Sequence, residues 1–161
     1  MINIEPKIVN VNKKMLIGHS LDMSMSDNKT QQLWQSFMPR LKEINPFRVN
    51  SDLVSMQVYE DYYDFQPHST FTKWATAEVS DFKTVPDGMK TLELESGLYA
   101  VFHYIGSSSD KRIFEYIFAS WLPKSQYQVD NRPHFEVLGE KYNNVDSNSE
   151  EHIYIPIKLK K

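Results

Sequence analysis

Cysteine is absent from the 161 residues of this chain. Disulfide bonds and thiolate metal sites are therefore excluded, and the composition fits a reducing compartment. The five histidines show no metal-ligand spacing, so the sequence predicts no metal site. Nucleophile-elbow, Walker A and dinucleotide-binding motifs are missing as well, and we expect neither a cofactor nor a catalytic residue.

Long apolar runs are also absent. No stretch approaches the ~18 apolar residues that a membrane helix needs, and the N-terminal segment MINIEPKIVNVNKK lacks the apolar core of a signal peptide. The formal net charge is −3, and the basic residues cluster only in the tail Lys158, Lys160 and Lys161. These features predict a cytoplasmic protein that contacts neither a membrane nor nucleic acid directly.

Apolar residues make up 40% of the chain, which is enough to build a core, and the sequence divides that core between two related halves. The segments LWQSFMPR (33–40) and IFASWLPK (117–124) match position by position, except for Gln35 and Ala119. Both segments have the apolar spacing of an amphipathic helix. The proline near the end of each predicts that the helix ends or kinks there.

The flanks of the two helices repeat in the same way. One strand-like segment precedes each helix, and two more follow it, with turn-rich pieces between them. The expected strands are 15–25, 53–60 and 71–80 in the first half, and 97–107, 134–142 and 152–159 in the second.

This repeat predicts an α+β fold. Three strands and one helix are too few for independent stability, so the two halves should join in one antiparallel sheet. We expect two pseudo-twofold strand–helix–strand–strand repeats, over about residues 8–80 and 90–160 of a single domain spanning 1–161. Both helices should lie on one face of the sheet, with a ligand cleft on the other face.

The alternation along each strand indicates which side chains share a face. The isoleucines of the last strand alternate and are assigned to the helix-covered core. Phe135 and Val137 are assigned to the same core, so Glu136 should lie on the opposite face, away from the helices. The same alternation adds three aromatic side chains to that face: Tyr59, Trp74 and Tyr154.

Aromatic rings around one carboxylate form a binding device for cations. Ring faces attract a cation within ~6 Å, and a partly desolvated carboxylate supplies its charge partner. Flat, apolar, positively charged molecules would suit such a cleft. The alternatives are that Glu136 is a solvated surface carboxylate and that the aromatic side chains are ordinary cross-strand packing.

These residues carry a resemblance to a known family. The strings SGLYAVFHYIGS, WLPKSQYQVDNRPHFEVLGEKY and HIYIPIK resemble the GyrI-like effector-binding domain, most strongly over 96–159. This domain is the small-molecule module of AraC-type and MerR-type multidrug regulators in bacteria. The resemblance implies two strand–helix–strand–strand repeats around a pseudo-twofold cleft, which agrees with the repeat above, and lipophilic cations as typical ligands.

The resemblance also implies roles for individual residues. The family's ligand acid corresponds to Glu136, and its terminal aromatic residue to Tyr154. A second acid commonly stands two positions before that aromatic residue, whereas here the position is His152, which leaves a different or neutral ligand as an alternative. Trp121 is kept as a further candidate, although its helical spacing is typical of core. The candidate ligand-binding residues are thus Glu136, Tyr154, Trp74, Tyr59, His152 and Trp121.

Three functions, each from a different class of protein, are compatible with these features. The first is reversible binding of a small organic molecule by a standalone protein, because no DNA-binding unit precedes the module in this sequence. The second is a protein-interaction role, since one family member inhibits DNA gyrase. The third is a hydrolase, in which a cleft glutamate with a raised pKa activates water, as described for some relatives.

Overall fold

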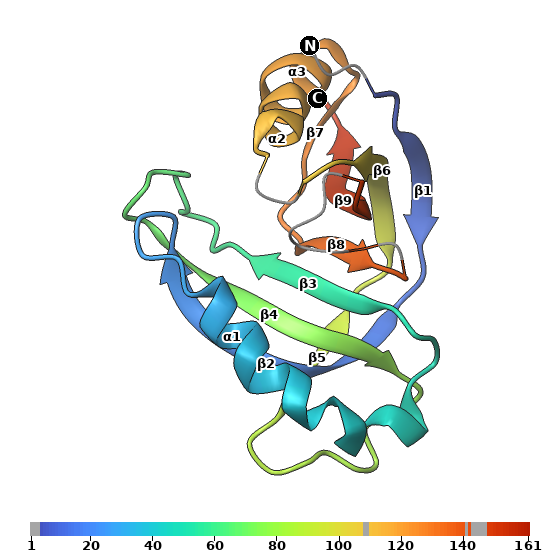
Figure 1. Ribbon diagram of the computed structural model, residues 1–161. Coiled ribbons are helices and arrows are strands. Elements are labelled where there is room, and N and C mark those ends of the chain that lie inside the picture. The colour runs from blue at the N-terminus through green and yellow to red at the C-terminus, as the bar shows by residue number, and fades with distance from the viewer. Residues whose placement is uncertain (1–3, 108–109, 141, 143–147) are drawn as a thin grey trace.

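A computed structural model describes residues 4–107, 110–140, 142 and 148–161 (Figure 1). The strands of this part form one nine-stranded sheet, and every pair of neighbours is antiparallel. The strand order is β1-β6-β9-β8-β3-β4-β2-β5, and β7 also pairs with β9. The strands are β1 (Lys7–Val11), β2 (Lys14–Ser24), β3 (Leu53–Val58), β4 (Thr70–Val79), β5 (Lys90–Leu94), β6 (Gly97–Ile105), β7 (Tyr127–Val129), β8 (His134–Leu138) and β9 (Glu150–Leu159).

The two helical segments end differently. In the first half, α1 (Thr30–Phe37) stops before Pro39, and two 3-10 turns follow, η1 (Met38–Glu43) and η2 (Asn45–Phe47). In the second half, α2 (Arg112–Tyr116) passes through the π-helical turn η3 (Ile117–Trp121) into α3 (Leu122–Lys124). Both helices therefore change type next to their proline: α1 gives way to 3-10 turns at Met38, and the second helix changes from π-helical to α-helical at Leu122 and ends at Lys124.

The strand–helix–strand–strand order occurs twice, as β2-α1-β3-β4 and β6-α2-β8-β9. The halves meet where β3 pairs with β8. At its outer edge, each half pairs with a short strand that comes from the other half of the sequence. Strand β1 precedes the first repeat but pairs with β6, whereas β5 precedes the second repeat but pairs with β2. The predicted order is confirmed, and this exchange of edge strands is an addition to it.

Both helices lie on the same face of the sheet. A row of paired residues crosses it from Ala75 through Ser55 and Glu136 to Ile153, so these four side chains point to one side. Ala75 packs in the core cluster beneath α1, and Ile153 packs in the cluster beneath α2 and η3. The prediction of an antiparallel sheet with its helices on one face is confirmed.

The opposite face carries a second core, and no helix of the described residues packs against it. Its central row runs from Trp74 through Met56 and Phe135 to Tyr154. The rings of Phe135 and Tyr154 are stacked with their centroids 4.4 Å apart. The placement of Phe135 under the helices was therefore wrong, because alternation shows which residues share a face but not which face the helices cover.

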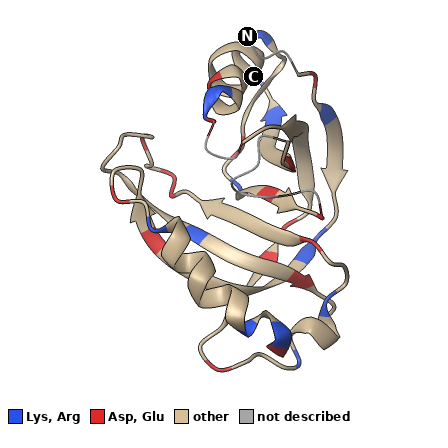
Figure 2. Cartoon of the chain, in the orientation of Figure 1, with Lys and Arg blue, Asp and Glu red and all other residues tan. Residues whose placement is uncertain are grey.

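Residues of both charges occur in each half of the described chain. Figure 2 shows Lys and Arg scattered over both halves of the chain and interspersed with Asp and Glu. Among the residues that the structure describes, no helix has the length and apolar character needed to cross a membrane.

Candidate functional site

Glu136 lies on the helix-bearing face, in the central strand β8 between the two helix-covered cores. It is partly buried, and the side-chain amide of Gln57 donates a hydrogen bond of 3.1 Å to its Oε1. Burial raises the pKa of Glu136 above that of an ordinary carboxyl group, while the nearby charge of Lys73 and the Gln57 hydrogen bond oppose this shift. Glu136 is therefore a sheltered acid and not a solvated surface group.

A second acid shares this face. Glu151 stands two residues before Ile153 in β9, so its side chain points to the same side of the sheet as Glu136. Only 8% of its surface is exposed. Burial, together with the negative charge of Glu136, raises the pKa of Glu151 to about 7. The two carboxyl groups hence share fewer than two negative charges near neutral pH.

A lysine lies beside these acids. Lys73 in β4 is paired with Gln57, the residue that binds Glu136, and its side chain is half-buried. Burial lowers the pKa of Lys73, against the charges of Glu136 and Glu151, which raise it. Within the described part of the chain, its ammonium group forms no ion pair. We call Gln57, Lys73, Glu136 and Glu151 the acid–lysine cluster.

Aromatic rings continue from this cluster along the same face. Tyr59 is at their centre, with ring centroids 4.7 Å from Tyr63, 5.5 Å from Phe71 and 5.0 Å from His134. Burial and the charge of Glu136 raise the pKa of the Tyr59 hydroxyl. His134, whose ring contacts Tyr59, stands two residues before Glu136 on the same side of β8. We call the following residues the aromatic cluster: Tyr59, Tyr63, Phe65, Phe71, Phe118 and His134.

The aromatic cluster combines three parts of the chain, one of which is β8 with His134. The segment between β3 and β4 supplies Tyr63 and Phe65, and the π-helical turn η3 supplies Phe118. Phe65 has a φ of 58°, in the left-handed region that few residues other than glycine adopt. Its ring approaches Phe118 at 6.5 Å, which links the first half of the chain to the second helix.

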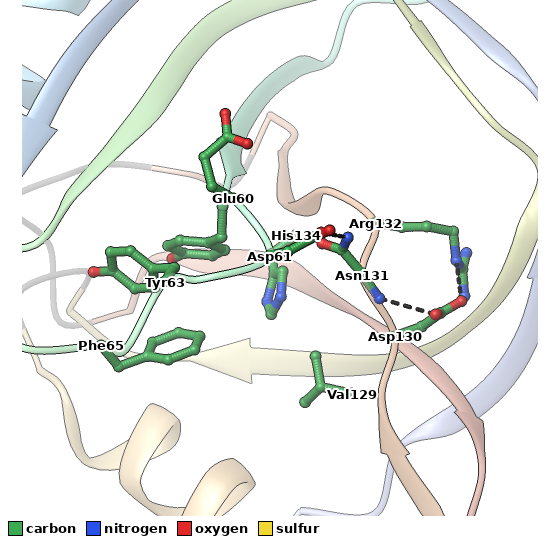
Figure 3. A pocket seen from close by; sticks show the side chains of 10 residues that line it. Glu60, Asp61, Tyr63, Phe65, Val129, Asp130, Asn131, Arg132 and His134 are labelled. Carbon is green, nitrogen blue, oxygen red and sulfur yellow. Dashed lines mark hydrogen bonds and ion pairs between the residues drawn. The ribbon is translucent and has the colours of Figure 1, made fainter.

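A pocket of about 390 Å³ opens beside the aromatic cluster (Figure 3). Its other wall is the turn between β7 and β8, where Arg132 donates hydrogen bonds to Asp130 and to two backbone carbonyl groups. Burial lowers the pKa of His134 to about 4, so its ring is neutral at physiological pH. The lining residues are Tyr59, Glu60, Asp61, Tyr63, Phe65, Val129, Asp130, Asn131, Arg132 and His134.

The structure brings together two of the six residues expected to bind a ligand, Glu136 and Tyr59. Trp74 and Tyr154 lie on the opposite face, in the row that contains Phe135. His152 shares that opposite face, where its ring stacks on His103 at 4.7 Å. The expectation that these three side chains surround Glu136 was wrong. Alternation shows which residues of one strand share a face, but the pairing between strands decides which residues of neighbouring strands share it.

Trp121 lies apart from both clusters. Its ring packs edge-on against Phe102 at 5.3 Å and next to Tyr127, within the core beneath the second helical segment. This is the core position that its helical spacing also indicated.

Sequence reasoning missed most of the remaining site, although some signals were present. Glu151 follows from extending the alternation of Ile153 and Ile157 by one step upstream. The stretch YEDYYDFQPHSTF (59–71) has an unusual density of aromatic residues, which a turn does not require. No pattern in the sequence indicates that Lys73 approaches Glu136, because this contact depends on the order of the strands.

Comparison with known proteins identifies the family and the fold of this chain. Residues 7–157 match the model of a family described as Cass2, the integron-associated effector binding proteins. The transcriptional regulator BrlR of Pseudomonas aeruginosa is 26% identical over 157 residues, which are 96% of this chain. The match spans 56% of the length of BrlR.

Solved structures show the same fold at low sequence identity. The structure of SAV2435 bound to tetraphenylphosphonium has a TM-score of 0.75 at 12% identity, covering 96% of this chain and 94% of the other. A hydrolase encoded by lin2189 from Listeria innocua has a TM-score of 0.59 at 13% identity, covering 96% and 92%. With nearly its whole length matched by the family model, this chain belongs to the integron-associated effector binding proteins, a GyrI-like effector-binding family of small-molecule-binding domains.

Proposed function

We propose that the helix-bearing face binds a lipophilic, aromatic cation between the acid–lysine cluster and the aromatic cluster. The observation that carries this proposal is the sheltered Glu136, whose raised pKa coincides with a wall of aromatic rings around Tyr59. A cation placed there gains a carboxylate partner and the electron-rich faces of the rings. The tetraphenylphosphonium bound to SAV2435, which has the same fold, supports this choice of ligand class.

The electrostatics of the empty site favour a positive guest. Burial of its carboxyl group, and then the negative charge of Glu136, raise the pKa of Glu151 to about 7. A bound cation stabilises the ionised form of both groups and offsets the cost of burying their charge. Binding of a cation should therefore release protons into the solvent.

The first prediction compares two ions of nearly equal shape and opposite charge. Tetraphenylphosphonium should bind and raise the melting temperature. At a hundredfold excess over Kd, binding should increase the free energy of unfolding by roughly 2.7 kcal/mol. Tetraphenylborate should produce no such shift, because the carboxyl groups repel it. Titration calorimetry with both ions checks this, and equal binding of the two would contradict a cation site.

The second prediction concerns the ring at the centre of the aromatic cluster. Replacing Tyr59 by leucine keeps an apolar side chain but removes the ring that contacts Tyr63, Phe71 and His134. Loss of one cation–π and stacking partner should weaken tetraphenylphosphonium binding by about 0.5–2 kcal/mol. The control is Tyr62→Leu, because Tyr62 is 83% exposed, and fluorescence titration of both variants should separate them.

A hydrolase is the second candidate, favoured by one observation. Glu151, with a pKa of about 7, is tuned for proton transfer at neutral pH and lies on the same face as Glu136. The Listeria innocua protein with the same fold is described as a hydrolase. Steady-state consumption of an activated aryl ester, abolished in Glu151→Gln, would favour this reading over reversible binding. The regulator BrlR adds a further proposal, that a ligand signal passes from this domain to a protein partner.

A further inference from the structure

Lys73 is an unexpected residue at the edge of a cation site. Its pairing with Gln57 places it one strand away from the amide that binds Glu136. On its own strand it stands between Phe71 of the aromatic cluster and Ala75 of the helix-covered core. An ammonium group therefore lies where the carboxyl groups and the aromatic rings meet.

The pseudo-twofold relation shows that the fold does not demand a lysine here. Met56 and Phe135 are paired with each other where the two halves meet, so they occupy equivalent positions. Trp74 is paired with Met56, and Tyr154 is paired with Phe135, so Trp74 and Tyr154 are equivalent as well. The counterpart of Lys73 is consequently Ile153, which packs under the second helix. The first half has a charged side chain where the second half has core.

A fixed cation in this place works against a ligand that is only cationic. The positive charge of Lys73 repels such a guest and already offsets part of the charge of Glu136. Burial disfavours the charged lysine, and no carboxylate in the described residues forms an ion pair with it. An anionic group on the ligand would supply the partner that the protein does not.

The spacing suits a ligand with two charges. Glu136 and Lys73 are on strands separated by β3, so their backbones are about 10 Å apart across the sheet. Both side chains point to the same face, and Gln57 lies between them with its amide directed at Glu136. The aromatic cluster begins immediately beyond, where Tyr59 and Phe71 face each other at 5.5 Å.

We propose that the site prefers zwitterionic aromatic ligands, with the cationic group at Glu136, the anionic group at Lys73 and the aromatic body on the ring of Tyr59. This rests on the proposed function and specifies its ligand class. Lys73 is then a residue that determines specificity. It makes the site bind zwitterionic aromatic compounds more tightly than simple lipophilic cations.

Rhodamine B and its methyl ester provide a matched pair of probes. Both carry the same cationic ring system, but only the parent dye has a free carboxylate. The unmodified protein should bind the parent dye about tenfold more tightly than the ester, as expected for one sheltered charge contact. In Lys73→Met this preference should disappear or reverse, since the variant keeps the length of the side chain without its charge.

Two further variants serve as controls. Lys73→Arg retains a positive charge and should retain the preference for the parent dye. Lys83→Met removes an exposed lysine and should change neither affinity. Thermal melting of every variant without dye verifies folding.

The possible failures can be told apart. If neither the ester nor tetraphenylphosphonium binds the unmodified protein, the cation site itself is wrong. If both cations bind but the parent dye binds no better than the ester, the zwitterion preference is overturned. A preference that persists unchanged in Lys73→Met overturns the role of Lys73.

Discussion

Replacing Glu136 with glutamine should weaken the binding of tetraphenylphosphonium by about tenfold or more. The amide keeps the shape of the side chain and removes its charge, and a hydrogen-bonded or ion-paired charge in a sheltered site contributes about 1.5–3 kcal/mol. Gln57 can still contact the new amide oxygen, so the local structure should persist. The empty variant should melt no earlier than the unmodified protein, because a buried charge has been removed.

The matched control for this experiment is Glu115→Gln, which makes the same change on the exposed side of α2. Titration calorimetry of the three proteins with tetraphenylphosphonium gives the affinities directly. An affinity of Glu136→Gln within twofold of the control, a difference of about 0.4 kcal/mol, would show that another group receives the cation.

The pH dependence of binding tests the same residue with a definite sign. Burial raises the pKa of Glu136 in the empty protein and raises that of Glu151 to about 7. Protonated acids attract a cation less, so affinity should rise with pH through these values and level off above them. Binding below that plateau should release protons, which calorimetry in buffers of different ionisation enthalpy detects. In Glu136→Gln the dependence should shrink, leaving the contribution of Glu151.

Replacing Trp74 with alanine should cost about 3–5 kcal/mol of the free energy of unfolding. Trp74 is buried in the core on the face opposite the helices, beside Met56 and in the row that continues to Phe135. Its removal leaves a cavity that the paired strands of the sheet cannot readily fill. Because Trp74 and Glu136 point to opposite faces, the fraction that remains folded should bind tetraphenylphosphonium as the unmodified protein does.

Urea unfolding at a low temperature measures the stability, and titration under folding conditions measures the affinity. Tyr62→Ala is the control, since truncating an exposed aromatic side chain should change stability by no more than about 0.5 kcal/mol. A Trp74→Ala protein of normal stability that has lost its affinity would place the ligand on the face away from the helices. That result would reverse the assignment of the site.

The repeated motifs of the sequence predicted the antiparallel sheet and the helices on one of its faces. Matching helical segments, the strands around them and their common order define an antiparallel sheet, because each of these features arises from local spacing of apolar residues. The short edge strand β5 and the exchange of β1 and β5 between the halves had no such signal. The pairing of these edge strands depends on which strand of the other repeat lies beside them once that repeat has folded.

Of the proposed ligand site, the sequence predicted Glu136 and Tyr59, because Glu136 is an acid between the apolar residues Phe135 and Val137 and the alternation along 53–60 places Tyr59 on one face with Gln57. Which face they occupy was decided by the tertiary structure alone. Alternation divides each strand into two sets of side chains, but only the helix connections show which set faces the helices. The same reason explains Lys73, Glu151 and Phe118, which reach Glu136 or its aromatic neighbours from β4, β9 and η3 through the strand order and helix packing, and not through proximity in the sequence.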